Sequence, residues 1–163
     1  MPATRNPKKG TLRPMPFTSQ IPYEAARIRA AAIYCSDGRI GAQCDDFLTN
    51  GLSLPRVDRV CLPGGPACLA GYPEATLAQQ GVVDELHFLV EAHGLDRVIL
   101  IAHQSCAFYG ARLNLAESRF KLVQEADLVR AAAFVHQVTK VDNIEAFFAR
   151  IDGEALVFDP VKV

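Results

Sequence analysis

The sequence lacks any apolar run near the roughly 20 residues that a membrane-spanning helix needs, so we expect no transmembrane segment. It also lacks an apolar stretch close behind its first residue, and we therefore expect no secretory signal and a cytoplasmic location. A formal net charge of -1 provides no global attraction to nucleic acid or to anionic lipid. No internal repeat and no low-complexity segment interrupts the 163 residues, a length that suits one domain with its own core.

Cysteine is present, but in a pattern that does not favour disulfides. The five cysteines are an odd number, and no two of them form the Cys-x-x-Cys pair that is typical of thiol redox proteins. Without a secretory signal we expect a reducing compartment, in which cysteines bind metal, catalyse or pack. A thiol redox function that uses Cys35 and Cys106 is therefore the less favoured alternative. We expect Cys44 and Cys61 to pack, and Cys68 either to pack or to approach a functional site.

The order of apolar segments along the chain predicts an α/β fold. Apolar runs predict buried strands at 30–35 and 97–102, and a further strand is predicted at 56–62. Helical periodicity or capping residues predict helices at 22–30, 42–48, 74–93 and 115–140. Residues 144–158 are typical of a β-hairpin that turns at Asp152-Gly153. Together these segments predict a small parallel β-sheet flanked by helices, with an antiparallel C-terminal hairpin at one edge.

The N-terminal segment differs in character from the rest of the chain. Residues 1–20 are rich in proline and show no periodicity, and the first 15 carry several basic residues and no acid. We predict an irregular N-terminal arm or tail over 1–20 and a single α/β domain over 21–163. The segment is either a solvated tail or an arm that packs on a partner subunit. Nucleic-acid binding is not expected, because the basic run is short and has no interleaved aromatic residues.

Two of the predicted strands end in groups that bind soft metal ions. Cys35 closes the first apolar run, and His103 and Cys106 follow the run at 97–102. Because ligands of parallel sheets bind beyond the carboxyl ends of the strands, we expect these three side chains to meet. Two thiolates and one imidazole suit Zn²⁺, and the thiolates balance the charge of the ion. Three protein ligands leave a fourth position open, as in catalytic zinc sites.

Asp37 and Arg39 alternate with Cys35, so an extended backbone would place all three side chains on one side. Arg39 can then hold the Asp37 carboxylate through two hydrogen bonds and keep it ionised. Such an Asp37 could orient a zinc-bound hydroxide, or could take the fourth zinc position if Arg39 released it. Taken singly, each of these residue types is more often a core residue or an ion pair. The zinc interpretation therefore depends on their combination.

That combination resembles a known family. Cys35-Ser36-Asp37-Gly38-Arg39 and His103-Gln104-Ser105-Cys106 are similar to the Cys-x-Asp-x-Arg and His-x-x-Cys signatures of the β-class carbonic anhydrases. The resemblance implies a domain built around a four-stranded parallel core, and a homodimer or higher homo-oligomer. It also implies zinc held by Cys35, His103 and Cys106, with Asp37 and Arg39 as a catalytic dyad. The implied reaction is the zinc-dependent reversible hydration of CO₂ to bicarbonate by zinc-bound hydroxide.

The sequence departs from the family pattern at two places. Ala107 stands where a glycine commonly follows the second cysteine, and residues 61–67 replace an Arg-Asn-Ala-Gly-Asn-like stretch that helps to shape the pocket. The Gly/Pro residues at 63–66 either let the backbone approach another group closely or form a plain turn. Two alternatives therefore stay open. One is a related hydrolase of a CO₂-like molecule such as carbonyl sulfide or carbon disulfide, and the other is a non-catalytic zinc-binding protein.

Overall fold

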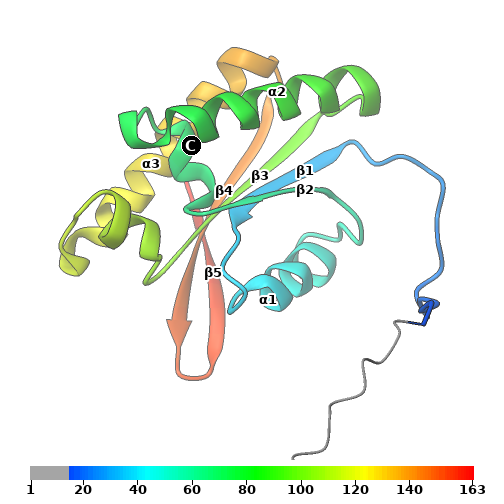
Figure 1. Ribbon diagram of the computed structural model, residues 1–163, viewed down its shortest axis with the longest axis horizontal. Coiled ribbons are helices and arrows are strands. Elements are labelled where there is room, and N and C mark those ends of the chain that lie inside the picture. The colour runs from blue at the N-terminus through cyan, green and yellow to red at the C-terminus, as the bar shows by residue number, and fades with distance from the viewer. Residues whose placement is uncertain (1–14) are drawn as a thin grey trace, which may run out of the picture.

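The computed structural model describes residues 15–163, which form a single β-sheet covered by helices on both faces (Figure 1). The strands are β1 (Ala30–Cys35), β2 (Asp58–Leu62), β3 (Arg97–His103), β4 (Asn143–Asp152) and β5 (Ala155–Val161). They follow the order β2-β1-β3-β4-β5; the first four are parallel, and β5 runs antiparallel to β4. The predicted α/β class, with an antiparallel C-terminal hairpin at one edge, is confirmed.

Helices cover both faces of the sheet, which explains why the inner strands β1 and β3 are apolar over most of their length. The helices are α1 (Gly41–Asp46), α2 (Thr76–His93) and α3 (Phe120–Thr139). In Figure 1, α2 and α3 lie on one side of the sheet and α1 on the other. Successive β4 residues contact the two layers: the Phe147 ring meets Phe47 just after α1, and Phe148 lies beneath Lys121 of α3. None of the helices within residues 15–163 is long and apolar enough to cross a membrane.

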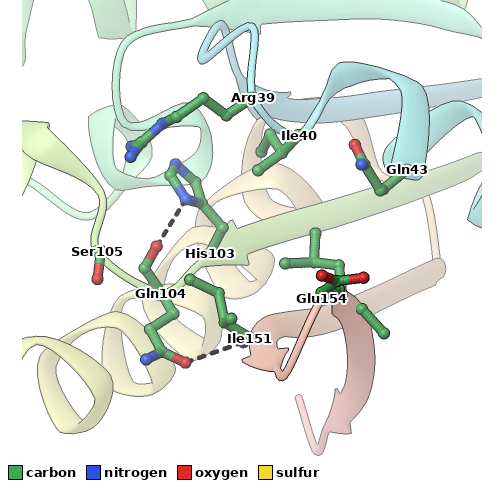
Figure 2. Close-up of a pocket in the computed structure, with 10 residues that line it drawn as sticks. Arg39, Ile40, Gln43, His103, Gln104, Ser105, Ile151 and Glu154 are labelled. Atoms are coloured by element: carbon green, nitrogen blue, oxygen red, sulfur yellow. Dashed lines mark hydrogen bonds between the residues drawn. The ribbon is translucent and has the colours of Figure 1, made fainter.

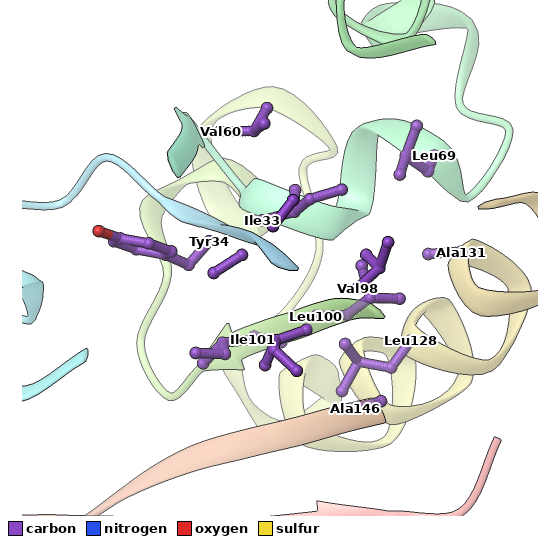
Figure 3. Close-up of a cluster of buried hydrophobic side chains, with 14 of the residues drawn as sticks. Ile33, Tyr34, Val60, Leu69, Val98, Leu100, Ile101, Leu128, Ala131 and Ala146 are labelled. Atoms are coloured by element: carbon purple, nitrogen blue, oxygen red, sulfur yellow. The ribbon is translucent and has the colours of Figure 1, made fainter. Parts of the chain in front are cut away.

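The core includes β1 and β3, the two most completely buried strands of the sheet (Figure 3). All six residues of β1 are buried, and so is every residue of β3 after Arg97. Ile33 and Leu100 have no exposed surface, and burying a side chain of this size stabilises the fold by about 1.5–3 kcal/mol. Leu128 of α3 closes the core from the helical side. β1 and β3, which end at Cys35 and His103, are thus the most fully buried strands of the sheet.

The C-terminal hairpin turns one residue later than expected. Asp152 pairs with Ala155, so the two-residue loop is Gly153-Glu154 rather than Asp152-Gly153. Gly153 has a φ of 61°, and glycine at the first central position suits a type II′ turn. The backbone conformation available to glycine thus sets the register of the hairpin.

The predicted helix at 22–30 is wrong. Residues 22–29 contain no helix, and Ala30 already begins β1. The carbonyl groups of Glu24 and Ala26 accept hydrogen bonds from Nη1 of Arg56, at 3.3 and 2.8 Å, and are therefore not used in helical hydrogen bonds. Residues 15–20 are irregular, as expected, and the remainder of the predicted arm lies outside the described residues.

Candidate metal centre

The carboxyl ends of β1 and β3 lie side by side and bring together three of the residues singled out in the sequence. Sγ of Cys35, Sγ of Cys106 and a ring nitrogen of His103 all lie within 4.8 Å of one another. The two sulfur atoms are 3.8 Å apart. All three residues are buried. Such a group could hold a metal ion in tetrahedral geometry and leave one position for a further ligand.

A tight turn after β3 directs its two candidate ligands to the same point. Ser105 in this turn has a φ of 55°, a left-handed conformation that costs a non-glycine residue about 1–2 kcal/mol. The backbone N–H of Gln104 donates to the carbonyl of Ala149, at 2.8 Å. The side-chain Oε1 of Gln104 accepts from the N–H of Ile151, at 3.0 Å (Figure 2). The hairpin therefore fixes both the backbone and the side chain of this turn.

The His103 ring presents an unprotonated nitrogen to its surroundings. Nδ1 lies 2.9 Å from the carbonyl oxygen of Gln104 (Figure 2). Because a carbonyl oxygen only accepts, Nδ1 donates this hydrogen bond, so the lone pair of the neutral ring is on Nε2. Nε2 is buried and has no hydrogen-bond partner within residues 15–163. Zinc-binding histidines use this arrangement, in which the second ring nitrogen donates to a carbonyl, and a metal ion would satisfy the unpaired atom.

Gln124 of α3 supports the same end of β3. It is 1% exposed, and its Nε2 donates to the carbonyl of His103, at 2.8 Å. The role of Gln124 was not predicted from the sequence. A signal was available, because Gln124 lies four positions from both Phe120 and Leu128, on the apolar stripe of the helix. A polar side chain in such a stripe indicates a buried hydrogen bond.

The two candidate thiol ligands share their environment. A hydrogen bond from Cys106 is the main reason that the pKa of Cys35 is lowered, and a hydrogen bond from the Gly64 backbone adds to it against the effect of burial. The same hydrogen bond, together with burial, raises the pKa of Cys106. The pair therefore accepts one negative charge readily. A second thiolate at this distance requires a cation beside it.

Arg39 holds the Asp37 carboxylate next to this group. Nη2 of Arg39 lies 2.5 Å from Oδ2 of Asp37, Nε lies 3.0 Å from Oδ1, and the Arg39 backbone N–H also donates to Oδ1. These contacts hold the pKa of Asp37 well below its usual range. The expected extended backbone is wrong here, because β1 ends at Cys35 and a turn follows, in which Ile40 N–H donates to the Asp37 carbonyl. Within residues 15–163, Asp37 is not among the side chains close enough to hold a metal ion together, which are those of Cys35, His103 and Cys106.

Two pockets open beside the three residues. The first, of about 160 Å³, includes Arg39, His103 and Gln104 and is closed by the hairpin residues Ile151 and Glu154 (Figure 2). The second, of about 220 Å³, is lined by Cys35, Ser36, Asp37, Pro63, Gly64, Ala107 and Phe108. Its walls are largely apolar, and it adjoins one candidate ligand and the carboxylate. This second pocket suits a small uncharged molecule.

The Gly/Pro loop after β2 passes very close to β1. A Cβ atom at Gly65 would lie 2.7 Å from the carbonyl carbon of Tyr34 and 2.8 Å from the backbone nitrogen of Cys35. Gly65 also has a φ of 53°. Of the two interpretations of this loop, the close backbone approach is therefore confirmed.

The other cysteines lie outside the ligand group. Cys44 and Cys68 are fully buried, and burial raises the pKa of each thiol to about 12. They pack as small apolar residues. Cys61 is exposed, so the expectation that it packs is wrong. The reason is that β2 is an edge strand, with only Val60 of its five residues buried.

A buried carboxylate anchors the segment that follows Cys106. Asp127 of α3 is 1% exposed and accepts hydrogen bonds from Tyr109 Oη, at 2.8 Å, and from Tyr72 Oη, at 3.0 Å. Arg130 completes the group as an ion pair with Asp127. This network was not predicted from the sequence, because its members are dispersed along the chain and none stands in a motif.

Comparisons with known proteins agree with this architecture. The sequence profile of a family described as "Putative carbonic anhydrase" matches residues 25–152. The structure is similar to β-carbonic anhydrase isoform I of Trichomonas vaginalis, with a TM-score of 0.57 and 12% identity, covering 86% of this chain and 87% of that one. A weaker match is the β-carbonic anhydrase CafA of Aspergillus fumigatus, with a TM-score of 0.42 and 16% identity over 83% and 76% of the two chains. A search of curated protein sequences gave no significant match.

Proposed function

The chain belongs to the carbonic anhydrase family, and from this membership we propose that it catalyses the zinc-dependent, reversible hydration of CO₂ to bicarbonate. The observation that carries the proposal is the position of His103. Its ring has a buried nitrogen without a partner, and it lies beside two buried cysteine sulfurs at the ends of adjacent strands. In an apolar core a buried nitrogen without a partner only costs free energy, whereas zinc would bind this nitrogen together with the two sulfurs.

We assign Cys35, His103 and Cys106 as the zinc ligands. Two thiolates and a neutral imidazole match the preference of zinc for sulfur and nitrogen, and the ion supplies the positive charge that a second thiolate requires. The Gln104 carbonyl fixes the His103 ring so that Nε2 keeps its lone pair. When bound, zinc would lower the pKa of a water molecule enough to provide a nucleophile near neutral pH.

Asp37 would act on the attacking water, and Arg39 would position Asp37. The carboxylate accepts from three N–H groups of Arg39, so it stays ionised and points in one direction. An ionised Asp37 can accept a hydrogen bond from the water and orient the water lone pair toward CO₂. Its attachment to Arg39 also keeps Asp37 away from the open ligand position, which favours the active arrangement.

The pocket that contains Asp37 would receive the substrate. Pro63, Ala107 and Phe108 give it apolar walls, and CO₂ is small, linear and without charge. Such walls accept CO₂ without the desolvation that an anion needs, and they favour release of bicarbonate once the charge has formed. Carbonyl sulfide and carbon disulfide share these properties, so the test must include them.

Stopped-flow CO₂ hydration on zinc-loaded protein tests the proposal. We expect about one zinc per chain by elemental analysis, and hydration by the wild type that greatly exceeds that of Asp37→Asn and Cys106→Ser. A folded wild type that binds zinc but hydrates CO₂ no faster than these variants would make the protein a non-catalytic zinc binder. Turnover of carbonyl sulfide or carbon disulfide without turnover of CO₂ would assign the hydrolase alternative.

We also propose that the chain assembles with copies of itself. The segment before β1 carries large apolar side chains that are 81–90% exposed, namely Met15, Phe17, Ile21 and Tyr23. Its base is fixed to the domain by an ion pair between Arg56 and Glu24, so the segment leaves the domain in a defined direction. Light scattering should give a dimer or larger species for the wild type and a smaller species for a Phe17→Ser/Ile21→Ser variant. A monomeric wild type would contradict the proposal.

A further inference from the structure

We propose that the loop 63–66 is a backbone clamp for Cys35, with Gly64 as the positioning residue. This inference rests on the zinc site proposed above and goes beyond it, because it assigns a role to the loop in which the sequence departs from the family pattern. The proposal rests on three contacts of this loop. They join the loop to the Cys35 sulfur, to the backbone of β1 and to the segment after Cys106.

The first contact is a hydrogen bond to sulfur. The backbone N–H of Gly64 donates to Sγ of Cys35, at 3.4 Å, and both groups are buried. A donor at this position fixes the direction of the sulfur and draws charge from a thiolate. Two thiolates donate more charge to zinc than histidines would, which makes the ion a weaker acid toward water. A hydrogen bond to one thiolate opposes that effect, and groups that bind metal ligands in this way tune the metal.

The second contact presses the loop against β1. The Cβ that any other residue would carry at position 65 meets the backbone of Tyr34 and Cys35 at less than 3.0 Å. These are main-chain atoms of a buried strand, so they cannot move aside. The Ser36 N–H donates to the Leu62 carbonyl, at 3.1 Å, which ties β1 to β2 immediately before the loop.

The third contact joins the loop to the other thiol-bearing segment. A Cβ at Gly64 would lie 2.5 Å from Cγ of Phe108 and 2.8 and 2.9 Å from its two Cδ atoms. Phe108 is buried and lies two residues after Cys106. The loop therefore touches β1 on one side and the segment after Cys106 on the other. A displacement of Gly64 would disturb both sulfur positions together.

Gly64 has the conformation that this packing requires. Its φ is 83°, in the left-handed region, and its carbonyl accepts from the Ala67 N–H, at 3.2 Å, in a 3₁₀ turn. Pro63 and Pro66 flank the two glycines and restrict the backbone. The loop is thus pre-organised to present one N–H to the sulfur, and no side chain fits at that point.

The test compares Gly64→Ala with a matched control, Gly71→Ala. Gly71 has a φ of 87°, and a Cβ there meets nothing within 4 Å. Both variants therefore place alanine in a left-handed conformation, but only the Cβ of Gly64→Ala collides with Phe108. Release of Zn²⁺ to an excess of chromogenic chelator gives the rate of metal loss. The thiolate-to-cobalt charge-transfer band of Co²⁺-loaded protein reports the sulfur environment. We expect Gly64→Ala to release zinc about ten- to a hundredfold faster with a shifted band, and Gly71→Ala to match the wild type.

A second variant removes only the hydrogen-bond donor. Replacing the amide between Pro63 and Gly64 by an ester deletes the N–H without adding an atom, so it tests the clamp even if Gly64→Ala does not fold. We expect faster zinc release and a shifted cobalt band here too. Wild-type release and an unshifted band in the ester protein would overturn the clamp and leave the zinc site intact. A wild type that holds no zinc would instead remove the proposed site, and the clamp with it.

Discussion

The sulfur atoms of Cys35 and Cys106 lie 3.8 Å apart although the two residues are 71 positions apart in the sequence. Parallel pairing of β1 with β3 brings the two strand ends together, and the left-handed Ser105 turns the chain back toward them. The resulting pair of thiols holds one negative charge readily and a second only next to a cation. A metal ion that bound between the two sulfurs would therefore stabilise the folded state.

Removing the metal should lower the stability of the wild type. Metal that binds only the folded state stabilises it by RT ln(1 + [metal]/Kd), about 4 kcal/mol when free zinc is a thousandfold above Kd. Thermal unfolding with and without a chelator measures the difference. Cys106→Ser should lose this zinc-dependent stabilisation, whereas Cys61→Ser, which changes an exposed cysteine outside the group, should keep it. An equal response of the two variants would contradict the ligand assignment.

Asp37→Asn should separate metal binding from catalysis. The amide cannot form the ion pair that Arg39 makes with the carboxylate, so the side chain at position 37 is no longer held in one orientation. It also has one acceptor oxygen instead of two. We expect zinc content near that of the wild type and kcat/KM lower by about a hundredfold, as for loss of a proton-accepting group. Stopped-flow CO₂ hydration measures this change.

Asp45→Asn is the matched control for that experiment. Asp45 forms an exposed ion pair with Arg59, at 2.9 Å, and belongs neither to the ligand group nor to the two pockets at the candidate centre. Its kcat/KM should stay at the wild-type value. A similar loss of activity in both variants would show that general surface charge, and not the Asp37–Arg39 pair, controls the rate.

Two tyrosines, the buried Tyr109 and the partly buried Tyr72, should make the protein sensitive to alkaline pH. Burial raises the pKa of Tyr109, and burial followed by the Asp127 charge raises the pKa of Tyr72 to about 12. Their unfolded value is about 10, so between pH 10 and 12 the unfolded state binds fewer protons than the folded state. Stability conferred by these groups is full below pH 10 and is lost as pH rises toward the folded pKa. Each fully buried tyrosine contributes a slope of about 1.4 kcal/mol per pH unit.

Tyr109→Phe isolates one of these groups. In chelator-treated protein, urea unfolding at pH 9 and pH 11 should show a smaller loss of unfolding free energy for Tyr109→Phe than for the wild type. Tyr23→Phe, at a residue that is 90% exposed, should behave like the wild type. Equal pH dependence in all three proteins would mean that Tyr109 ionises as freely in the folded state as in the unfolded one.

The sequence was sufficient for the sheet and for the proximity of the three candidate ligands, because both depend on periodic or terminal features. The buried runs of β1 and β3 stand out as apolar, and their carboxyl ends must meet in a parallel sheet. The sequence was not sufficient where a side chain from a distant part of the chain determines the local structure. Arg56 donates to the carbonyls of Glu24 and Ala26 from 32 and 30 positions away, and no local sequence pattern predicts this contact.

The local geometry around the three candidate ligands was likewise not predictable from the sequence. The orientation of His103 depends on Gln104 through a local hydrogen bond and on Gln124 through a contact between elements. The Asp37–Arg39 pair forms in a turn, so period-two alternation was the wrong description of its backbone. A non-glycine residue at positive φ, such as Ser105, carries no compositional signal at all. These details follow from packing rather than from motif spacing.

Gln124→Glu should test how strongly α3 holds the end of β3. A carboxylate cannot donate to the His103 carbonyl, whereas a protonated carboxyl can, so folding would favour the protonated form and raise the pKa of the introduced group. A raised folded-state pKa means that stability is retained below the unfolded value of about 4.3 and is lost as pH rises through the folded value. The variant should therefore be destabilised relative to the wild type by more at pH 7 than at pH 5, as measured by urea unfolding.

The control for this variant is Gln137→Glu, which makes the same chemical change at an exposed position of the same helix. It should show nearly the same destabilisation at both pH values, because its carboxylate stays in water. Zinc release from Gln124→Glu should also be faster at pH 7 than from the control, since the His103 carbonyl is no longer fixed. If the two variants lost stability equally at both pH values, the Gln124 hydrogen bond would contribute nothing to the position of His103.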